Sequence, residues 1–297
     1  MMRRIAACLS ILAANAAVAG DSDHALTLWR SEGTSNSIYL LGSVHLLREE
    51  DHPLHSAIDA AYDDADVVVM ELDMDDLDPA KAQAAFRRAG VLTDGTTLRD
   101  LMGEEPYAQA EKAAAAVDVP LDMLAQSEPW LAAITVELMA LYRIGFNPLF
   151  GVEMTITNRA TSDGKPIEGL ETVDEQLAFL DGLPLEAQRE MLLQTLTGSA
   201  ALPESIDGTI EAWHHGDVQA LERDLLSAIR EQPALHAALL VDRNRRWAEA
   251  IAGWIGDDRD YLVVVGALHL VGDEGVPALL EDKGIGIHQL SHSEGLR

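Results

Sequence analysis

The sequence of 297 residues is poor in cysteine, in aromatic residues and in basic residues. Each scarcity excludes certain classes of site or partner. Cysteine occurs once, as Cys8, aromatic residues make up 5%, and 21 Lys and Arg stand against 50 Asp and Glu. A single cysteine excludes intramolecular disulfides and zinc or iron–sulfur sites built from cysteines. The few aromatic residues argue against stacking platforms for bases. The formal net charge of −29 repels phosphate backbones and anionic lipids, so nucleic acid is not an expected partner.

Signatures of several common enzyme classes are absent as well. The sequence contains no His-Glu-x-x-His, no Gly-x-Ser-x-Gly and no P-loop motif. The familiar zinc-protease helix, the nucleophile elbow of serine hydrolases and the phosphate-binding loop of nucleotide enzymes are therefore not expected.

The N-terminus has the pattern of a secretory signal peptide. Arg3 and Arg4 precede an apolar stretch over residues 5–18, and small residues lead up to Ala19. This arrangement is typical of a signal that is cleaved after Ala19. We expect residues 1–19 to be removed, together with Cys8, and the protein to be exported to the periplasm or secreted.

The remaining chain, residues 20–297, has no apolar run long enough to span a bilayer. The nearest candidate, residues 130–141, is short and contains Glu137, so we expect no integral membrane segment in the mature chain. Hydrophobic residues make up 48% of the sequence and charged residues 24%, which is typical of a globular protein. No linker rich in proline, glycine or serine divides the chain, so we predict a single domain.

Apolar periodicity places strands near both ends and helices between them. Predicted strands cover residues 25–30, 37–41, 67–70, 165–170, 261–265 and 286–290. The first two flank a turn cluster and predict a hairpin. A helix that starts at Pro53 predicts a right-handed crossover and a parallel pair between 37–41 and 67–70. Residues 78–160 and 172–254 are predominantly helical. We predict an α/β fold with a mixed central sheet of N- and C-terminal strands, covered by a largely helical middle region.

Two Gly-x-x-His segments follow predicted strands, Gly42 to His45 and Gly266 to His269. Ligands of open α/β sheets bind at the carboxyl ends of strands, and imidazole is both a common metal ligand and a general base. If the two strands are neighbours, the histidines converge on one site. The alternative is that they are two unrelated loop histidines.

Two glutamates also follow predicted strands. Glu71 ends the apolar run 67–70, and Glu171 follows the strand 165–170. A carboxylate at the end of a buried strand is costly unless it is paired or bound to a cation. With His45 and His269 these donors suit Zn²⁺, Mn²⁺, Fe²⁺ or Co²⁺ with positions left open for water. Helix capping or a salt bridge would explain each glutamate equally well.

The helical stretch 241–247 gathers three of the chain's scarce arginines, and Arg243 and Arg246 share one helix face. They are candidates to balance a carboxylate-rich site or to stabilise an anionic transition state. The alternative is that they form ordinary surface ion pairs.

These residues lie in segments that resemble the TraB/GumN (TIKI-like) family. The ordered set consists of Leu40–His45, Val69–Asp73, Gly164–Thr172, Arg243-Asn244 and Val265–Gly272. The resemblance extends from about residue 28 to residue 290. It implies membership of the superfamily that also holds erythromycin esterases and ChaN-like haem-binding lipoproteins. Ser43 stands where the esterase relatives carry glutamate.

The resemblance also implies an α/β fold with paired Gly-x-x-His motifs, and animal TIKI members are described as metal-dependent proteases. We therefore expect an exported metal-dependent hydrolase that acts on a peptide or a small molecule and uses Mn²⁺, Co²⁺ or Zn²⁺. His45, Glu71 and His269 are the expected metal ligands, Glu171 the proton relay, and Arg243 the group that steadies an oxyanion or orients Glu71. The alternatives are a non-enzymatic metal- or haem-binding protein and a scaffold with a degenerate site.

Overall fold

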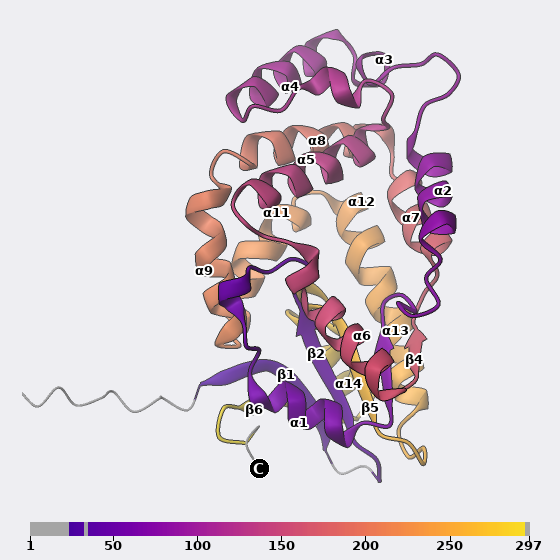
Figure 1. Cartoon of the computed structure of the whole chain (residues 1–297), viewed down its shortest axis with the longest axis vertical. Coiled ribbons are helices and arrows are strands. Elements are labelled where there is room, and N and C mark those ends of the chain that lie inside the picture. Colours follow the sequence, from indigo (N-terminus) through magenta and orange to yellow (C-terminus); the bar gives the residue numbers. More distant parts are fainter. Residues whose placement is uncertain (1–23, 33–34, 295–297) are drawn as a thin grey trace, which may run out of the picture.

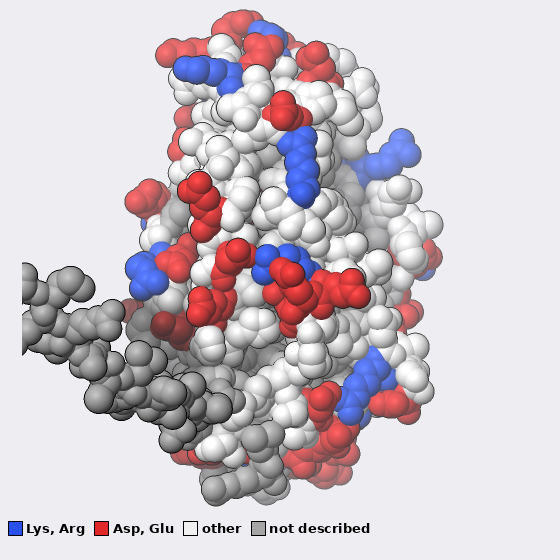
Figure 2. Space-filling model, turned by 60° about the vertical axis from the view of Figure 1, so that its left-hand side comes forward, with Lys and Arg blue, Asp and Glu red and all other residues white. Residues whose placement is uncertain are grey.

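The computed structural model describes residues 24–32 and 35–294 (Figure 1). The signal peptide predicted at residues 1–19 lies outside the described residues. Within the described ranges, none of the helices has both the length and the apolar character that crossing a bilayer requires. Acidic side chains outnumber basic ones on the face that Figure 2 shows, with the two signs interspersed.

The predicted α/β fold with a mixed sheet is confirmed. Six strands form one sheet in the order β4-β3-β5-β2-β1-β6. They are β1 (Ala25–Glu32), β2 (Ile38–Ser43), β3 (Val67–Met70), β4 (Ile167–Gly169), β5 (Tyr261–Gly266) and β6 (Gly286–Ser291). The strands β2, β5, β3 and β4 run parallel, whereas β1 pairs antiparallel with β2 and β6. The N- and C-terminal segments therefore build the sheet, with β4 added from the middle region.

The predicted pairing of β2 with β3 is wrong, because β5 lies between them. In β5, Gly266 pairs with Ser43 of β2, and Val264 pairs with Met70 of β3. Residues 261–265 of β5 are buried throughout. This strand is apolar on both faces, so the central position buries most of its surface. A strand from the end of the chain thus separates two strands that follow each other in sequence.

Helices cover both faces of the sheet because strand side chains alternate in direction. Leu41 and Val264 point to one face and pack with α1 (Ser56–Asp64), α6 (Val152–Asp163) and α9 (Leu202–His214). Leu40 and Val263 point to the other face and pack with α13 (Asp242–Gly253) and α14 (Val276–Asp282). The predicted helix at Pro53 starts later, at Ser56, with His55 as the N-cap.

The middle of the chain forms a helical region beyond the carboxyl ends of the parallel strands (Figure 1). Its helices are α2 (Pro79–Gly90), α3 (Leu98–Met102), α4 (Glu104–Ala116), α5 (Pro129–Arg143), α7 (Val173–Asp181) and α8 (Leu185–Gly198). Leu98, Tyr107, Val136 and Leu192 belong to a separate buried cluster of this region. Short helices, α10 (Val218–Leu221), α11 (Ser227–Arg230) and α12 (Pro233–His236), lead with two π-helical segments back to α13.

Candidate functional site

Four of the five candidate residues from the sequence lie at the carboxyl ends of four adjacent parallel strands, and Arg243 reaches them from α13. His45 follows β2, Glu71 follows β3 and Glu171 follows β4, while His269 lies in the 3₁₀ turn after β5. Backbone hydrogen bonds from Leu170 to Met70 (2.8 Å) and from Glu171 to Glu71 (3.0 Å) continue the parallel ladder beyond the strands. They hold the two glutamates side by side.

Gly266 leaves a space that three of these residues face. A methyl group at its Cβ position would lie 3.4 Å from Glu71 Oε1, 3.6 Å from His269 Cδ2 and 3.9 Å from His45 Nε2. The backbone N–H of Gly266 also donates to Glu71 Oε1 over 2.9 Å. Both histidines of the Gly-x-x-His segments therefore approach the same carboxylate, and the absence of a side chain at Gly266 leaves the space between them open.

Arg243 links the two glutamates. Its Nη2 donates to Glu71 Oε2 (2.6 Å) and to Glu171 Oε1 (2.5 Å), and its Nε donates to Glu171 Oε2 (3.1 Å). The guanidinium also donates to the carbonyl of Leu239 in the π-helical segment Ala237–Val241, which precedes α13. Arg243 is a buried partner of two carboxylates, which excludes the interpretation that it forms only surface ion pairs.

His269 is held as a neutral imidazole of one tautomer. Asn244 Nδ2 donates to the carbonyl of Glu274 (2.8 Å), which turns its Oδ1 toward His269 Nδ1 at 2.5 Å. The Nδ1–H of His269 therefore donates, and its Nε2 accepts from Arg243 Nη1 over 3.2 Å. Burial lowers the pKa of His269 to about 3, so the ring is uncharged at neutral pH.

The pKa values of the two glutamates are shifted in opposite directions. Burial favours the neutral form of Glu71, but the positive charges of His269 when protonated, Arg243 and His45 outweigh it and lower the pKa of Glu71 to about 2. For Glu171 burial prevails over Arg243 and raises the pKa above its ordinary value. The Glu171 side chain has no exposed surface, whereas Glu71 faces the space at Gly266.

His45 forms the open side of the cluster. Its side chain is 62% exposed, against 10% for Glu71 and 6% for His269. Its Nδ1 lies 2.7 Å from Glu153 Oε1. The Glu153 carboxylate raises the pKa of His45 to about 10, so the ring is a cation at neutral pH.

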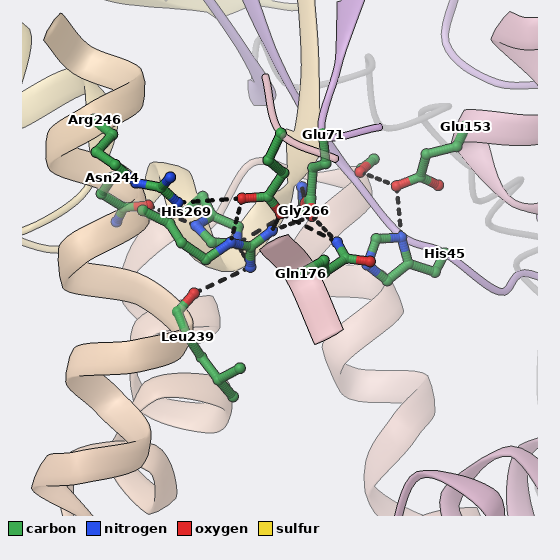
Figure 3. Close-up of polar contacts among 12 residues, drawn as sticks. His45, Glu71, Glu153, Gln176, Leu239, Asn244, Arg246, Gly266 and His269 are labelled. Carbon is green, nitrogen blue, oxygen red and sulfur yellow. Dashed lines mark hydrogen bonds and ion pairs between the residues drawn. The ribbon is translucent and has the colours of Figure 1, made fainter. Parts of the chain in front are cut away.

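Three polar residues around the cluster were not singled out from the sequence as site residues. Gln176 of α7 donates to Glu71 Oε2 and Glu171 Oε1, both at 3.3 Å. Asn244 fixes His269, and Glu153 of α6 contacts His45 (Figure 3). Asn244 follows Arg243 in a motif of the family resemblance, which was a usable signal. Glu153 and Gln176 carry no local signal, because only tertiary contacts bring them to the strand ends.

The donor set at Gly266 fits a divalent cation in type. Two imidazoles and a carboxylate oxygen are ligands that Zn²⁺, Mn²⁺ and Co²⁺ accept. Among the described residues, no three His, Cys, Asp or Glu side chains stand close enough together to hold a metal ion as they are placed. Coordination would require His45, the exposed member, to lose the proton on its Nε2 and to move toward Glu71, and it would require Arg243 to release His269 Nε2.

A cleft of about 810 Å³ opens beside the cluster. Its walls come from the loop between β3 and α2, from α2 itself and from the start of α7, and Glu171 is one of its lining residues. The cleft therefore reaches the edge of the sheet at which the cluster lies.

Comparisons with known proteins identify a family and two distant relatives of the chain. The model of the TraB/PrgY/gumN family matches residues 27–289. The chain is 22% identical over 242 residues to "Uncharacterized protein YbaP" of Escherichia coli (strain K12), an alignment that covers 82% of the chain and 87% of the relative. The same protein name from Shigella flexneri matches with the same identity and coverage. No solved structure gives a significant match.

Proposed function

Because the chain belongs to the TraB/PrgY/gumN family, we propose that the cluster at Gly266 is the active site of a metal-dependent hydrolase. Its substrate class is a peptide or a small molecule with a hydrolysable carbonyl group. His45, Glu71 and His269 are the proposed ligands of a divalent cation, with Mn²⁺, Co²⁺ and Zn²⁺ as candidates. When bound, such a cation supplies Lewis acidity, which polarises a carbonyl group and lowers the pKa of water.

The shared space at Gly266 is the observation that carries this proposal. His45 Nε2, Glu71 Oε1 and the ring of His269 all lie within 4 Å of one point. The residues come from three different strand ends and surround a position that has no side chain. A merely structural ion-pair network would not need an exposed imidazole or an open space beside its buried carboxylate.

The residues of the chain have distinct roles in this proposal. Asn244 keeps the Nε2 lone pair of His269 directed toward Arg243, and Glu71 Oε1 lies 3.9 Å from that nitrogen. Arg243 neutralises Glu71 and Glu171 and supplies a positive charge for a developing oxyanion. Glu171 has a raised pKa but no exposed side-chain surface. A proton relay through Glu171 would therefore pass through Glu71 and not directly to substrate.

Cation binding and turnover, measured on the same protein, test the proposal. Isothermal titration with Mn²⁺, Co²⁺ and Zn²⁺ should give one site on the wild type and none on His45→Ala or His269→Ala. His288→Ala, a histidine of β6 that pairs with Glu32, is the matched control and should retain the site. Hydrolysis of a peptide library should depend on the cation and stop with a chelator.

The outcomes separate the alternatives. Binding without turnover would favour a metal-binding protein, and binding of haem instead of a divalent ion would favour a haem carrier. If the wild type and both variants respond alike to cations, the ions bind to the acidic surface and the assignment of these ligands is wrong. A wild type that binds no cation and has no activity would favour a scaffold with a degenerate site.

We further propose that the hydrolase acts outside the cytoplasm. The support is the basic, apolar and small-residue pattern of residues 1–19. Sequencing of the exported protein should give Gly20 as its first residue. A protein that retains Met1 after export would contradict cleavage, and one that begins at Cys8 would indicate a lipid anchor.

A further inference from the structure

We propose that Glu153 is a positioning residue of the site, which fixes the imidazole of His45 so that its Nε2 faces Glu71 and His269. Glu153 is 108 residues from His45 in sequence and lies in the first turn of α6. The inference rests on the proposed function for what His45 does, but the positioning itself can be tested without it.

The hydrogen bonds of Glu153 set the direction of the imidazole. Its Oε1 accepts from His45 Nδ1 at 2.7 Å, and the hydroxyl of Ser43 donates to the same oxygen. The carboxylate oxygen that accepts from the Ser43 hydroxyl also faces His45 Nδ1, so the nitrogen is the donor. With Nδ1 bound there, the opposite ring nitrogen is the one that lies 3.9 Å from the Cβ position of Gly266.

The backbone holds the start of α6 against the segment that carries His45. Val152 N–H donates to the carbonyl of Val44 over 3.1 Å. At Gly151 a Cβ atom would lie 2.1 Å from the carbonyl oxygen of His45, so only glycine permits this approach. Leu47 and Asn147 form an isolated antiparallel bridge a few residues away. These backbone contacts hold Glu153 in a fixed position next to His45.

The burial of Glu153 also distinguishes it from a surface ion pair. Its side chain is 15% exposed, and within the described part of the chain its Oε2 is buried without a hydrogen-bond partner. An unsatisfied buried carboxylate oxygen is costly for stability. An uncharged side chain could fill this position equally well. We therefore infer that the charge of Glu153 acts on His45.

The two histidines of the site are held through the same ring atom by different groups. A neutral amide, Asn244, accepts from Nδ1 of the buried His269, and a carboxylate, Glu153, accepts from Nδ1 of the exposed His45. Carboxylate partners orient a histidine and make its other nitrogen a stronger ligand. The stronger partner therefore serves the histidine that solvent would otherwise leave free to rotate.

Glu153→Gln tests the proposal, because it keeps the shape and removes the charge. Glu137→Gln is the matched control: this α5 carboxylate interacts electrostatically with His45 but forms no hydrogen bond with it among the described residues. In protein with ¹⁵N-labelled histidine, the His45 Nδ1–H signal, assigned by its loss in His45→Ala, should be downfield and protected from exchange. Glu153→Gln should move it upfield, since the bond is no longer charge-assisted, and Glu137→Gln should not.

Mn²⁺ affinity is the second readout. Loss of a partner that orients a metal-ligating histidine typically weakens binding by about 10- to 100-fold, which is expected for Glu153→Gln and not for Glu137→Gln. The positioning role is overturned if the Nδ1–H signal is unchanged in Glu153→Gln, or if both variants alter it equally. A wild type that shows the signal but binds no Mn²⁺ would contradict the proposed function and leave the positioning role supported.

Discussion

Arg243 is the residue on which the buried charges of the site depend. It is 7% exposed and contacts Glu71 and Glu171, which are 10% and 0% exposed. Arg243→Met would leave two buried carboxylates without their cation, so we expect a loss of about 3–5 kcal/mol in the free energy of unfolding. Urea denaturation followed by circular dichroism measures the loss.

Arg246→Met is the control for this prediction. Arg246 lies one turn further along α13, is 46% exposed and contacts Glu171 only at 3.5 Å. An exposed pair of this kind contributes at most about 1 kcal/mol. Equal losses in the two variants would show that the network at Arg243 does not stabilise the fold.

The glycines of the two Gly-x-x-His segments look equivalent in the sequence, but the structure separates them. A Cβ at Gly42 would lie 2.5 Å from Thr27 Cγ2 and 3.2 Å from Ala267 Cα, in a packed interior. Gly42→Ala should therefore cost about 1–3 kcal/mol through overpacking. Gly266→Ala meets only ordinary contacts and should change stability by less than about 1 kcal/mol.

For function we expect the opposite order: Gly266→Ala should impair cation binding and turnover more than Gly42→Ala. The methyl group of Gly266→Ala would occupy the space between His45 and Glu71, so cation affinity and turnover should fall in a protein that melts normally. Thermal melts with titration of Mn²⁺ check both properties. Normal cation binding by Gly266→Ala would argue against this space as the metal site.

At the level of elements, the N-cap of α7 connects helix stability to the site. Thr172 caps α7 in a capping box with Glu175, and this helix carries Gln176, which donates to both buried glutamates. Thr172→Ala should lower stability by about 1 kcal/mol. Because the start of the helix loosens, cation affinity should fall as well.

Thr97→Ala is the matched element-scale control. Thr97 caps α3 by the same kind of box, with Asp100, but α3 belongs to the helical region and packs in its separate core. We expect a similar loss of stability with unchanged cation affinity, measured by the same melts and titrations. If both variants weaken binding equally, the effect reflects global stability and not the position of Gln176.

For the whole molecule, the groups with shifted pKa values predict that the free energy of unfolding is largest near neutral pH. The pKa of His269 is lowered from 6.5 to about 3, so its contribution is present above pH 6.5 and is lost as the pH falls toward 3. The pKa of Glu71 is lowered from 4.5 to about 2, and its contribution is lost over that lower range. Both groups therefore destabilise the fold in acid.

On the alkaline side His45 acts in the opposite sense. Its pKa is raised from 6.5 to about 10, so its contribution is present below pH 6.5 and is lost as the pH rises toward 10. The ring is 62% exposed, so solvent screening makes this alkaline loss the smaller one. Urea denaturation from pH 4 to 9 measures both sides. His269→Gln should flatten the acid side, and an unchanged profile would contradict the assignment to His269.

The elements and the position of the candidate site were predictable from the sequence, because both depend on local patterns. The continuous apolar runs 67–70 and 261–265 indicate strands buried on two faces wherever they lie in the sheet. The polar residues that follow them, Glu71 and His269, must then lie at the sheet edge when the strands are parallel. This reasoning also located the ends of β2 and β4 with His45 and Glu171.

Only the tertiary structure decided which strands and charges meet. β5 enters between β2 and β3 because strand order follows from competition for the most buried position, which local patterns do not encode. Arg243 meets Glu71 across 172 residues, and Glu153 meets His45 across 108. A charged residue carries no local mark of a distant partner, since its pairing becomes favourable only when packing excludes water from both.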